Sequence, residues 1–311
     1  MLDLSGIENL GITGANGFIG KSITEKISSL SYEKLPQKIT FITRNGLNFQ
    51  LEERVKDRSV DISQDLTETW KFAKNISHFL NLAADGSREP YGIEACQNFT
   101  KISSNLVQWL EGVDFQMQIF HASSGACFGP QPLLGGQNSK NRKELFMQNR
   151  IAVESYLVQR VPSMNHALSI GRLFSFSGKN MLEKSQYALT NFIQTSLTTK
   201  RVQVAGDPLT QRSYLHQNSM SEWILKALTS PIPYTDLQIG SSEALTLKEL
   251  AEFVAKSTGA DLEFSSNPES GDIYIPNNAD TRIKLGVDEG LGWKAAALEM
   301  INEARMSIDV N

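Results

Sequence analysis

Short apolar runs alternate with longer amphipathic stretches through the first half of the chain. Five runs rich in apolar and β-branched residues have the character of buried parallel strands: 10–13, 38–43, 59–62, 76–84 and 116–122. Two stretches between them repeat apolar residues at helical spacing: Ile19, Ile23, Ile27 and Leu30, then Ile102, Leu106, Val107 and Leu110. This alternation predicts an α/β protein with a doubly wound parallel sheet.

The pattern changes from about residue 175 onward, where strand and helix no longer alternate strictly. Apolar spacing predicts helices near 188–198, 247–257 and 295–306. Two further runs, at 202–204 and 236–240, fit strands, and the second is expected to return to the main sheet. The C-terminal part is therefore expected to form a smaller α/β domain.

A glycine-rich turn, Thr13-Gly14-Ala15-Asn16-Gly17-Phe18-Ile19-Gly20, joins the first strand to the first helix. Glycines at such spacing allow a tight turn, close approach of the backbone to a pyrophosphate, and contact between helix and strand. The helix N-terminus also offers N–H groups and a positive dipole end to phosphates. We expect a dinucleotide to bind here through Gly14, Asn16, Gly17, Phe18, Ile19 and Gly20, although a turn that binds nothing also explains this stretch taken alone.

The ends of the following strands supply further candidate cofactor contacts. Arg44 follows the second strand, where an arginine pairs with a 2′-phosphate and a carboxylate would repel it, so NADP is expected rather than NAD. The alternative is a solvated surface arginine. Asp61, followed by Ile62, offers an acceptor for an adenine amino group. The small residues of Leu82-Ala83-Ala84 leave room for a ligand beyond the fourth strand.

Composition excludes several classes of protein. The formal charge of −4, from 30 basic and 34 acidic residues, argues against a nucleic-acid-binding protein. No apolar run reaches the ~18–20 residues that span a bilayer, and no signal-peptide pattern is present, so the cytoplasm is the expected location. The two cysteines, Cys96 and Cys127, form neither a disulfide framework nor a metal-ligand spacing. No metal site is expected.

Several short motifs follow one another in a fixed order. After the glycine-rich turn they are Asp61-Ile62, Asn81-Leu82-Ala83-Ala84, Ser123-Ser124-Gly125-Ala126-Cys127-Phe128-Gly129, Arg172-Leu173-Phe174-Ser175, Gln211-Arg212-Ser213-Tyr214-Leu215-His216, and Asp280-Thr281-Arg282 through Leu291-Gly292-Trp293-Lys294. In this order the chain resembles an extended short-chain dehydrogenase/reductase, of the branch that holds nucleotide-sugar epimerases, dehydratases and reductases. The resemblance covers nearly the whole chain.

The resemblance implies a catalytic serine, tyrosine and lysine, and two of the three are replaced here. Ser124 lies at the serine position, where a hydroxyl binds the substrate oxygen; it could also simply end a strand. Glu154 aligns with the glutamate that follows the family's lysine, which puts Phe146 at the tyrosine position and Arg150 at the lysine position. Phenylalanine has no proton to exchange, whereas arginine keeps the charge that contacts the nicotinamide ribose.

Tyr156 with Arg160 repeats the tyrosine–lysine spacing further along the same helix. It lies ten residues after Phe146, about 15 Å along a helix that rises ~1.5 Å per residue. It can reach the same substrate hydroxyl only if the alignment is different. Two functional hypotheses follow: an enzyme with altered proton handling, or a catalytically silent binding protein that serves as a regulator or partner subunit.

The resemblance also implies a substrate, a domain division and an assembly. The substrate is a nucleotide-diphosphate sugar, bound by Ser124, Ser175 and Arg212, with Arg212 on the diphosphate; a solvated Arg212 is the alternative. Gly125-Ala126 replaces the acidic pair of the 4,6-dehydratases, which disfavours dehydration. A Rossmann-type NADP domain is expected over 1–174 plus about 215–242, and a substrate domain over about 175–214 and 243–311. A homodimer through the helices near 89–111 and 143–160 is expected.

Overall fold

The structure is a computed structural model that describes residues 2–72, 74–84, 91–128, 137–182, 186–265 and 271–309. Its contacts divide the chain into two compact units. Unit 1 comprises Met1–Gly129, Gln137–Leu173 and Ser221–Leu237, and the described part of unit 2 lies within Phe174–Met220 and Gln238–Asn311. The assignment of cofactor to one unit and substrate to the other stays a prediction.

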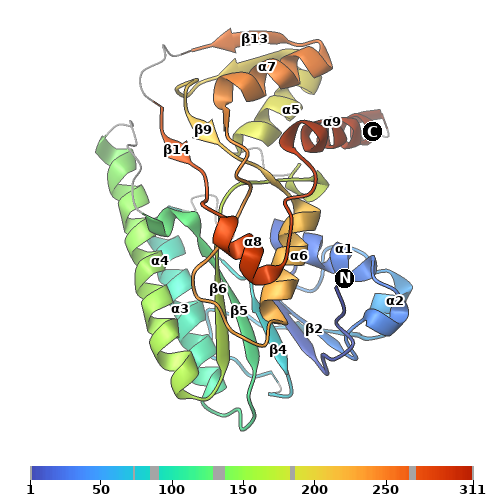
Figure 1. Ribbon diagram of the computed structural model, residues 1–311, viewed down its shortest axis with the longest axis vertical. Coiled ribbons are helices and arrows are strands. Elements are labelled where there is room, and N and C mark those ends of the chain that lie inside the picture. Colours follow the sequence, from blue (N-terminus) through green and yellow to red (C-terminus); the bar gives the residue numbers. More distant parts are fainter. Residues whose placement is uncertain are drawn as a thin grey trace. The chain divides into compact units, whose positions relative to one another are not determined.

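The core of unit 1 is the predicted doubly wound sheet, with strand order β11-β6-β5-β4-β1-β2-β3. Figure 1 labels β6, β5, β4 and β2 of this sheet. The strands are β1 (Leu10–Thr13), β2 (Ile39–Thr43), β3 (Ser59–Ser63), β4 (His78–Asn81), β5 (Gln118–Ser124), β6 (Ala167–Leu173) and β11 (Leu237–Ile239). All pairs from β3 to β6 are parallel. The chain reverses its order between β1 and β4, and ligands of such sheets bind beyond the carboxyl ends of the strands at that point.

The fourth strand is shorter than its apolar run predicts. It ends at Asn81, because the next two backbone N–H groups, of Leu82 and Ala83, donate to the Thr13 hydroxyl at 3.1 and 3.3 Å. These two residues and Ala84 therefore leave the sheet beside the end of β1. They form the edge of the reversal point.

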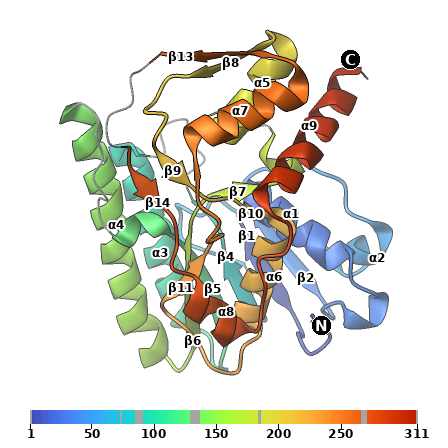
Figure 2. The same cartoon turned by 45° about the horizontal axis from the view of Figure 1, so that its top comes forward.

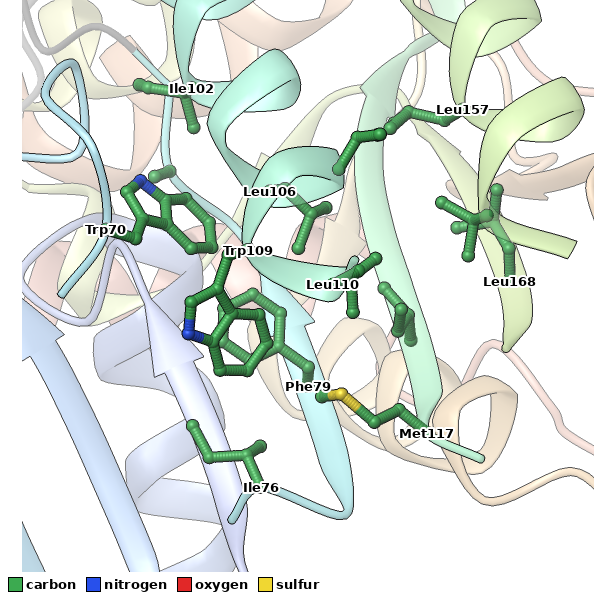
Figure 3. Close-up of a cluster of buried hydrophobic side chains, with 14 of the residues drawn as sticks. Trp70, Ile76, Phe79, Ile102, Leu106, Trp109, Leu110, Met117, Leu157 and Leu168 are labelled. Carbon is green, nitrogen blue, oxygen red and sulfur yellow. The ribbon is translucent and has the colours of Figure 1, made fainter. Parts of the chain in front are cut away.

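Helices α3 (Ile93–Leu110) and α4 (Gln137–Ser163) lie side by side over one face of the sheet (Figures 1 and 2). Their buried residues pack with those of three strands: Ile102 and Leu106 from α3, Leu157 and Val161 from α4, and Phe79, Ile119, Leu168 and Ile170 from the sheet. Figure 3 shows part of this core, in which the rings of Phe79 and Trp109 lie 5.6 Å apart. Burial of each large side chain contributes roughly 1.5–3 kcal/mol.

The opposite face of the sheet carries α1 (Phe18–Ser28) and the part of α6 (Gln217–Leu228) that belongs to unit 1. Ser169 alternates with the core residues Leu168 and Ile170, and its hydroxyl donates to the Ala227 carbonyl of α6. Lys26 of α1 forms an ion pair with Glu222 of α6 at 3.1 Å. The sequence analysis did not identify α6, although its buried Met220, Trp223, Ile224, Ala227 and Leu228 have helical spacing.

Unit 2 is built from short strands and four helices in its described part. The helices are α5 (Ala188–Thr198), α7 (Leu247–Thr258), α8 (Ala279–Leu285) and α9 (Trp293–Asp309). The strands are β7 (Phe176–Ser177), β8 (Arg201–Val204), β9 (Gln211–Arg212), β10 (Leu215–His216), β12 (Leu245–Thr246), β13 (Asp261–Phe264) and β14 (Ile273–Tyr274). The predicted helices α5, α7 and α9, and the return of β11 to the main sheet, are confirmed.

Candidate active site

The glycine-rich turn is shaped by its own packing. Gly14 has φ of 70°, and a side-chain carbon there would lie 2.8 Å from the Leu82 carbonyl group. A carbon on Gly20 would lie 2.5 Å from the Gly14 oxygen, so these two positions require glycine. Gly17 has more room, with the Gly14 oxygen 3.3 Å from such a carbon. The turn thus brings the ends of β1, β4 and α1 together.

Helix α1 begins without a side-chain cap. Its N-cap residue is Gly17, which has no side chain to accept a hydrogen bond, and Phe18, Ile19 and Gly20 form its first turn. An uncapped N-terminus of a long helix fits a phosphate group. Asn16 has a different partner, because its amide donates to the Gly46 carbonyl at 2.8 Å and accepts from the Asn48 N–H at 3.0 Å. Asn16 therefore fastens the turn to the segment after β2.

Arg44 directly follows β2, and Asp61 lies within the neighbouring strand β3. The Arg44 side chain is 64% exposed, and its Nε lies 3.5 Å from an Asp65 carboxylate oxygen. Asp61 accepts from the Thr43 hydroxyl at 2.9 Å and from the Leu47 N–H at 2.7 Å. The carboxylate of Asp61 therefore orders the segment after β2, and Ile62 beside it is half-buried.

A buried polar chain runs across the reversal point. The Thr13 hydroxyl donates to Asn81 Oδ1 at 3.2 Å, and Asn81 Nδ2 lies 3.0 Å from His121 Nδ1. Because the amide nitrogen can only donate, His121 Nδ1 is the acceptor. Burial, with a smaller contribution from the Arg150 charge, lowers the pKa of His121 to about 3, so this imidazole stays neutral. Its Nδ1 is therefore engaged inside unit 1.

The carboxyl end of β5 leads into a second buried network. The Ser124 hydroxyl is half-buried and accepts from the Ala126 N–H at 3.2 Å. Its neighbour Ser123 donates to Glu154 of α4, as does the Cys127 thiol at 3.2 Å. Burial and the Glu154 charge raise the pKa of the Cys127 thiol to about 11. Cys127 is therefore a proton donor within the packing and a poor nucleophile.

Arg172 completes this network from β6. Its guanidinium group binds both carboxylate oxygens of Glu154, with Nη2 at 2.8 Å. Burial alone would raise the pKa of Glu154, but the hydrogen bonds from Arg172, Ser123 and Cys127 outweigh it and hold that pKa below its usual range. The carboxylate therefore stays charged and joins α4 to β5 and β6.

Phe146 and Arg150 lie one helical turn apart on α4. Arg150 is 6% exposed, and its guanidinium carbon lies 3.3 Å from the ring centroid of Phe99 and 4.4 Å from that of Phe146. Burial lowers the pKa of Arg150 to about 10, which leaves it charged at neutral pH. Within the described residues its hydrogen bond goes to Asn149, and it forms no ion pair with a carboxylate. The aromatic faces hold this cation.

Two aromatic residues of this region were missed by the sequence analysis. Phe99 of α3 carries the Arg150 cation, and Tyr91, which precedes α3, packs edge-on against Phe146 with centroids 5.1 Å apart. Neither contact can be predicted from neighbouring residues in the sequence, because the residues of α3 are distant from those of α4 along the chain. The apolar spacing identified Phe99 only as part of a helix.

The predicted substrate residues Ser175 and Arg212 both belong to unit 2, whereas Ser124 belongs to unit 1. Ser175 is half-buried. Arg212 on β9 pairs with Asp272 at 2.7 Å, and the Asp272 carbonyl accepts from the Gln211 N–H at 2.7 Å. Arg212 is therefore held in a fixed place within unit 2 and is not a freely solvated arginine.

In the parts of the chain that the structure describes, no group of histidine, cysteine and carboxylate side chains has the arrangement of a metal site. Among the same residues, no helix is long and apolar enough to cross a membrane.

Comparison with known proteins identifies relatives over most of the chain. Residues 10–240 match the model of the "NAD dependent epimerase/dehydratase family". A relative, GDP-mannose 3,5-epimerase 1 of Oryza sativa subsp. indica, is 25% identical over an aligned length of 308, and the alignment covers 91% of this chain and 76% of the relative.

Solved structures match the fold at lower identity. UDP-glucose 4-epimerase of Thermotoga maritima has a TM-score of 0.76 at 16% identity and covers 96% of this chain and 99% of its own. UDP-N-acetylglucosamine 4-epimerase of Methanobrevibacter ruminantium has a TM-score of 0.76 at 18% identity, over 99% and 100% of the two chains. The sheet order, the glycine-rich turn and the matched family model agree, and the chain belongs to the NAD dependent epimerase/dehydratase family, a family of enzymes.

Proposed function

We propose that this chain is an NADP-preferring enzyme that carries out redox or epimerase chemistry on a nucleotide-diphosphate sugar, with proton handling altered at Phe146 and Arg150. One observation carries the proposal. Arg150, at the family's lysine position, is a buried cation held by two aromatic faces and without a carboxylate partner among the described residues. A buried cation is costly unless it is compensated, and a guanidinium group held in this way fits contact with the nicotinamide ribose.

The residues of unit 1 fit a dinucleotide. Gly14 and Gly20 build a turn that has no room for side chains, and the uncapped first turn of α1 supplies N–H donors for a pyrophosphate. Leu82, Ala83 and Ala84 line the reversal point with small or apolar side chains. Asp61 and Ile62 are proposed contacts of the adenine end.

Arg44 supports the preference for NADP over NAD. Its ion pair with Asp65 is exposed, and such surface pairs contribute only about 0–1 kcal/mol. A 2′-phosphate carries more charge than one carboxylate and offers more acceptor oxygens, so it would displace Asp65 from the guanidinium group.

The bound cofactor would supply a hydride acceptor and donor at the nicotinamide. The residues of the chain itself are proposed to bind and orient the cofactor and the sugar. The Ser124 hydroxyl is proposed to donate to the reacting sugar oxygen, and Arg150 to hold the nicotinamide ribose with a permanent charge. Phe146 cannot move a proton, so another side chain, water or the substrate must do so.

The substrate class follows from the relatives and from unit 2. The relatives named above act on GDP-mannose, UDP-glucose and UDP-N-acetylglucosamine, according to their names. Arg212, held by Asp272, is proposed to bind the diphosphate, and Ser175 to contact the sugar. Gly125 and Ala126 follow Ser124 directly, in place of an acidic pair, so we propose epimerisation or reduction and not 4,6-dehydration.

The observation at Phe146 also keeps a second candidate open. A chain that binds the cofactor and the nucleotide sugar without turnover would serve as a regulator or partner subunit, and loss of the phenol favours it. Incubation of the NADP-loaded protein with a panel of nucleotide sugars separates the two. Product from the wild-type chain supports the enzyme; no product, with turnover gained in the Phe146→Tyr/Arg150→Lys variant, supports the silent protein.

The cofactor preference has its own test. In Arg44→Asp, NADPH affinity is expected to fall by about 10-fold or more while NADH affinity changes little, because a charge-assisted contact contributes ~1.5–3 kcal/mol. Arg201→Asp is the matched control, since Arg201 is 65% exposed and pairs with Glu263 much as Arg44 pairs with Asp65. Fluorescence titration measures both affinities. Equal loss of NADPH and NADH binding would contradict the preference.

A further inference from the structure

The proposed function leaves one proton without a carrier. Phe146 presents a bare ring where the family has a phenol, and two titratable groups that the structure describes in unit 1, His121 and Cys127, are unsuited to exchange a proton with a substrate. His121 is 1% exposed and stays neutral, with its Nδ1 bonded to Asn81. The Cys127 thiol donates into the Glu154 carboxylate. The group that exchanges the proton is therefore sought among the other described residues in contact with Phe146.

Tyr91 makes direct contact with Phe146. The two ring centroids lie 5.1 Å apart with the ring planes at 78°, so the tyrosine meets the phenylalanine edge to face. Tyr91 is 44% exposed. It precedes the N-cap residue Gly92 and therefore lies at the start of α3, in the segment that follows the reversal point of the sheet.

The same Phe146 ring also carries the Arg150 cation, at 4.4 Å from its centroid. The Phe146 ring thus contacts two groups, the phenol ring of Tyr91 and the guanidinium group of Arg150. The arrangement holds both chemical groups of a tyrosine–lysine pair, a phenol hydroxyl and a permanent positive charge. The phenol comes from the turn that precedes α3.

The other tyrosines of the chain are placed differently. The chain has seven. In unit 1, the Tyr32 ring is covered by Arg58 at 3.9 Å, Tyr156 lies ten residues beyond Phe146 on α4, and the Tyr234 backbone binds β6 at Ser169 and Ile170. Three more belong to unit 2: Tyr187, Tyr214 and Tyr274. Among the described ring contacts, Tyr91 alone brings a phenol onto Phe146.

We propose that Tyr91 supplies the phenol that position 146 lacks, and that its hydroxyl exchanges the proton of the reacting sugar hydroxyl. The inference rests on the proposed function. Tyr91 enters the oxidation as the phenolate, its own proton having passed to solvent. The sugar O–H bond then breaks, and its proton forms the O–H bond of Tyr91. The adjacent C–H bond breaks, its hydrogen and electron pair pass to the nicotinamide as hydride, and the C–O bond becomes C=O. The sugar is oxidised by two electrons, NADP is reduced by two, and the reverse step returns proton and hydride.

The test compares Tyr91→Phe with Tyr156→Phe, the matched control on α4. Removing a positioned general acid/base lowers kcat by about 10²–10⁴-fold, which is the change expected in Tyr91→Phe, with nucleotide-sugar affinity unchanged. Tyr156→Phe is expected to keep wild-type kcat. Adding Phe146→Tyr to Tyr91→Phe should restore turnover, because the phenol returns to the neighbouring ring.

A second readout does not depend on turnover. In protein labelled with carbon-13 at the tyrosine ζ position, the resonance missing from Tyr91→Phe identifies Tyr91. That resonance should shift when UDP-glucose or GDP-mannose is added, and the resonance missing from Tyr156→Phe should not.

The outcomes separate the two proposals. If the wild-type chain turns over a nucleotide sugar and Tyr91→Phe does so at the same rate, the role of Tyr91 is wrong and the proposed function stands. A Tyr91 resonance unmoved by a substrate that is turned over has the same meaning. If the wild-type chain turns over no member of the panel, the proposed function fails and the role of Tyr91 fails with it.

Discussion

At the scale of single residues, Glu154 joins three elements through one carboxylate. It receives hydrogen bonds from Ser123 at the end of β5, from Cys127 after it, and from Arg172 on β6. The Glu154 side chain is 8% exposed and that of Arg172 is 23% exposed, so the pair is shielded from water. The Glu154 carboxylate therefore anchors the chain on both sides of Ser124, at Ser123 and at Cys127.

We predict that Glu154→Ala lowers the free energy of unfolding by about 3–5 kcal/mol, because it leaves the Arg172 charge without its partner. Glu111→Ala is the control. It breaks an exposed pair with Arg160, whose side chains are 54% and 44% exposed, and should change that free energy by about 0–1 kcal/mol. Urea unfolding followed by circular dichroism measures both. Equal effects would show that the Glu154 network is not a buried one in solution.

At the scale of elements, Glu289 fastens two connections of unit 2. Its carboxylate accepts from the Ser242 N–H at 2.9 Å after β11 and from Asn278 Nδ2 at 2.7 Å at the start of α8. Burial alone would raise the pKa of Glu289, but the hydrogen bonds from Asn278, Ser241 and Ser242 prevail and hold that pKa below its usual range.

The lowered pKa of Glu289 predicts acid sensitivity. The folded protein binds this proton less readily than the unfolded chain, whose glutamates titrate near pH ~4.3, so the stabilisation is complete above that pH. This stabilisation is lost as the pH falls through the lower pKa that Glu289 has in the folded protein. Glu289→Gln should therefore be less stable than the wild type at neutral pH, with a shallower loss of stability in acid.

Urea midpoints measured from neutral pH down to about pH 3 check this expectation. The control is Glu252→Gln on α7, where the glutamate is 50% exposed and 3.8 Å from Lys248. It should follow the wild-type curve. If the urea midpoint of Glu289→Gln fell with pH in parallel with that of the wild type, other carboxylates would account for the loss of stability in acid.

At the scale of the whole molecule, each unit has its own core, and unit 1 leaves apolar side chains exposed on α3 and α4. Ile93 of α3 is 66% exposed, and Ile151 and Val158 of α4 are 41% and 42% exposed. Ile151 and Val158 lie seven residues apart, which places them on one side of the helix. These residues support the proposal of a homodimer through α3 and α4.

We predict that the wild-type chain sediments with about twice its mass of 34.5 kDa, and that Ile151→Glu/Val158→Glu sediments as a monomer. Charges placed at the centre of an apolar interface lose their solvation on association. Ile283→Glu is the control, since Ile283 of α8 is 81% exposed and lies in unit 2. Sedimentation equilibrium gives the masses. A monomeric wild type would contradict the homodimer.

The sequence predicts those parts of the fold that have a local pattern. The strands β1 to β3 and the helices α5 and α7 begin and end within one or two residues of their apolar runs. The end of β4 was not predictable in this way, because the Thr13 hydroxyl, from another strand, binds the N–H groups of Leu82 and Ala83. Pairing of Arg212 with Asp272 likewise joins residues that no local pattern connects.

By itself, the sequence determined the alternation of strands and helices and the glycine-rich turn, and it predicts a phosphate site at that turn and the loss of a phenol at Phe146. Apolar periodicity and glycine spacing act over a few residues, so they can be recognised without a fold. Only the tertiary structure decided what surrounds Phe146: the burial of Arg150 against Phe99 and the contact with Tyr91. Both contacts arise where α3 packs beside α4, and packing between elements that are distant in the sequence depends on the complete core of unit 1.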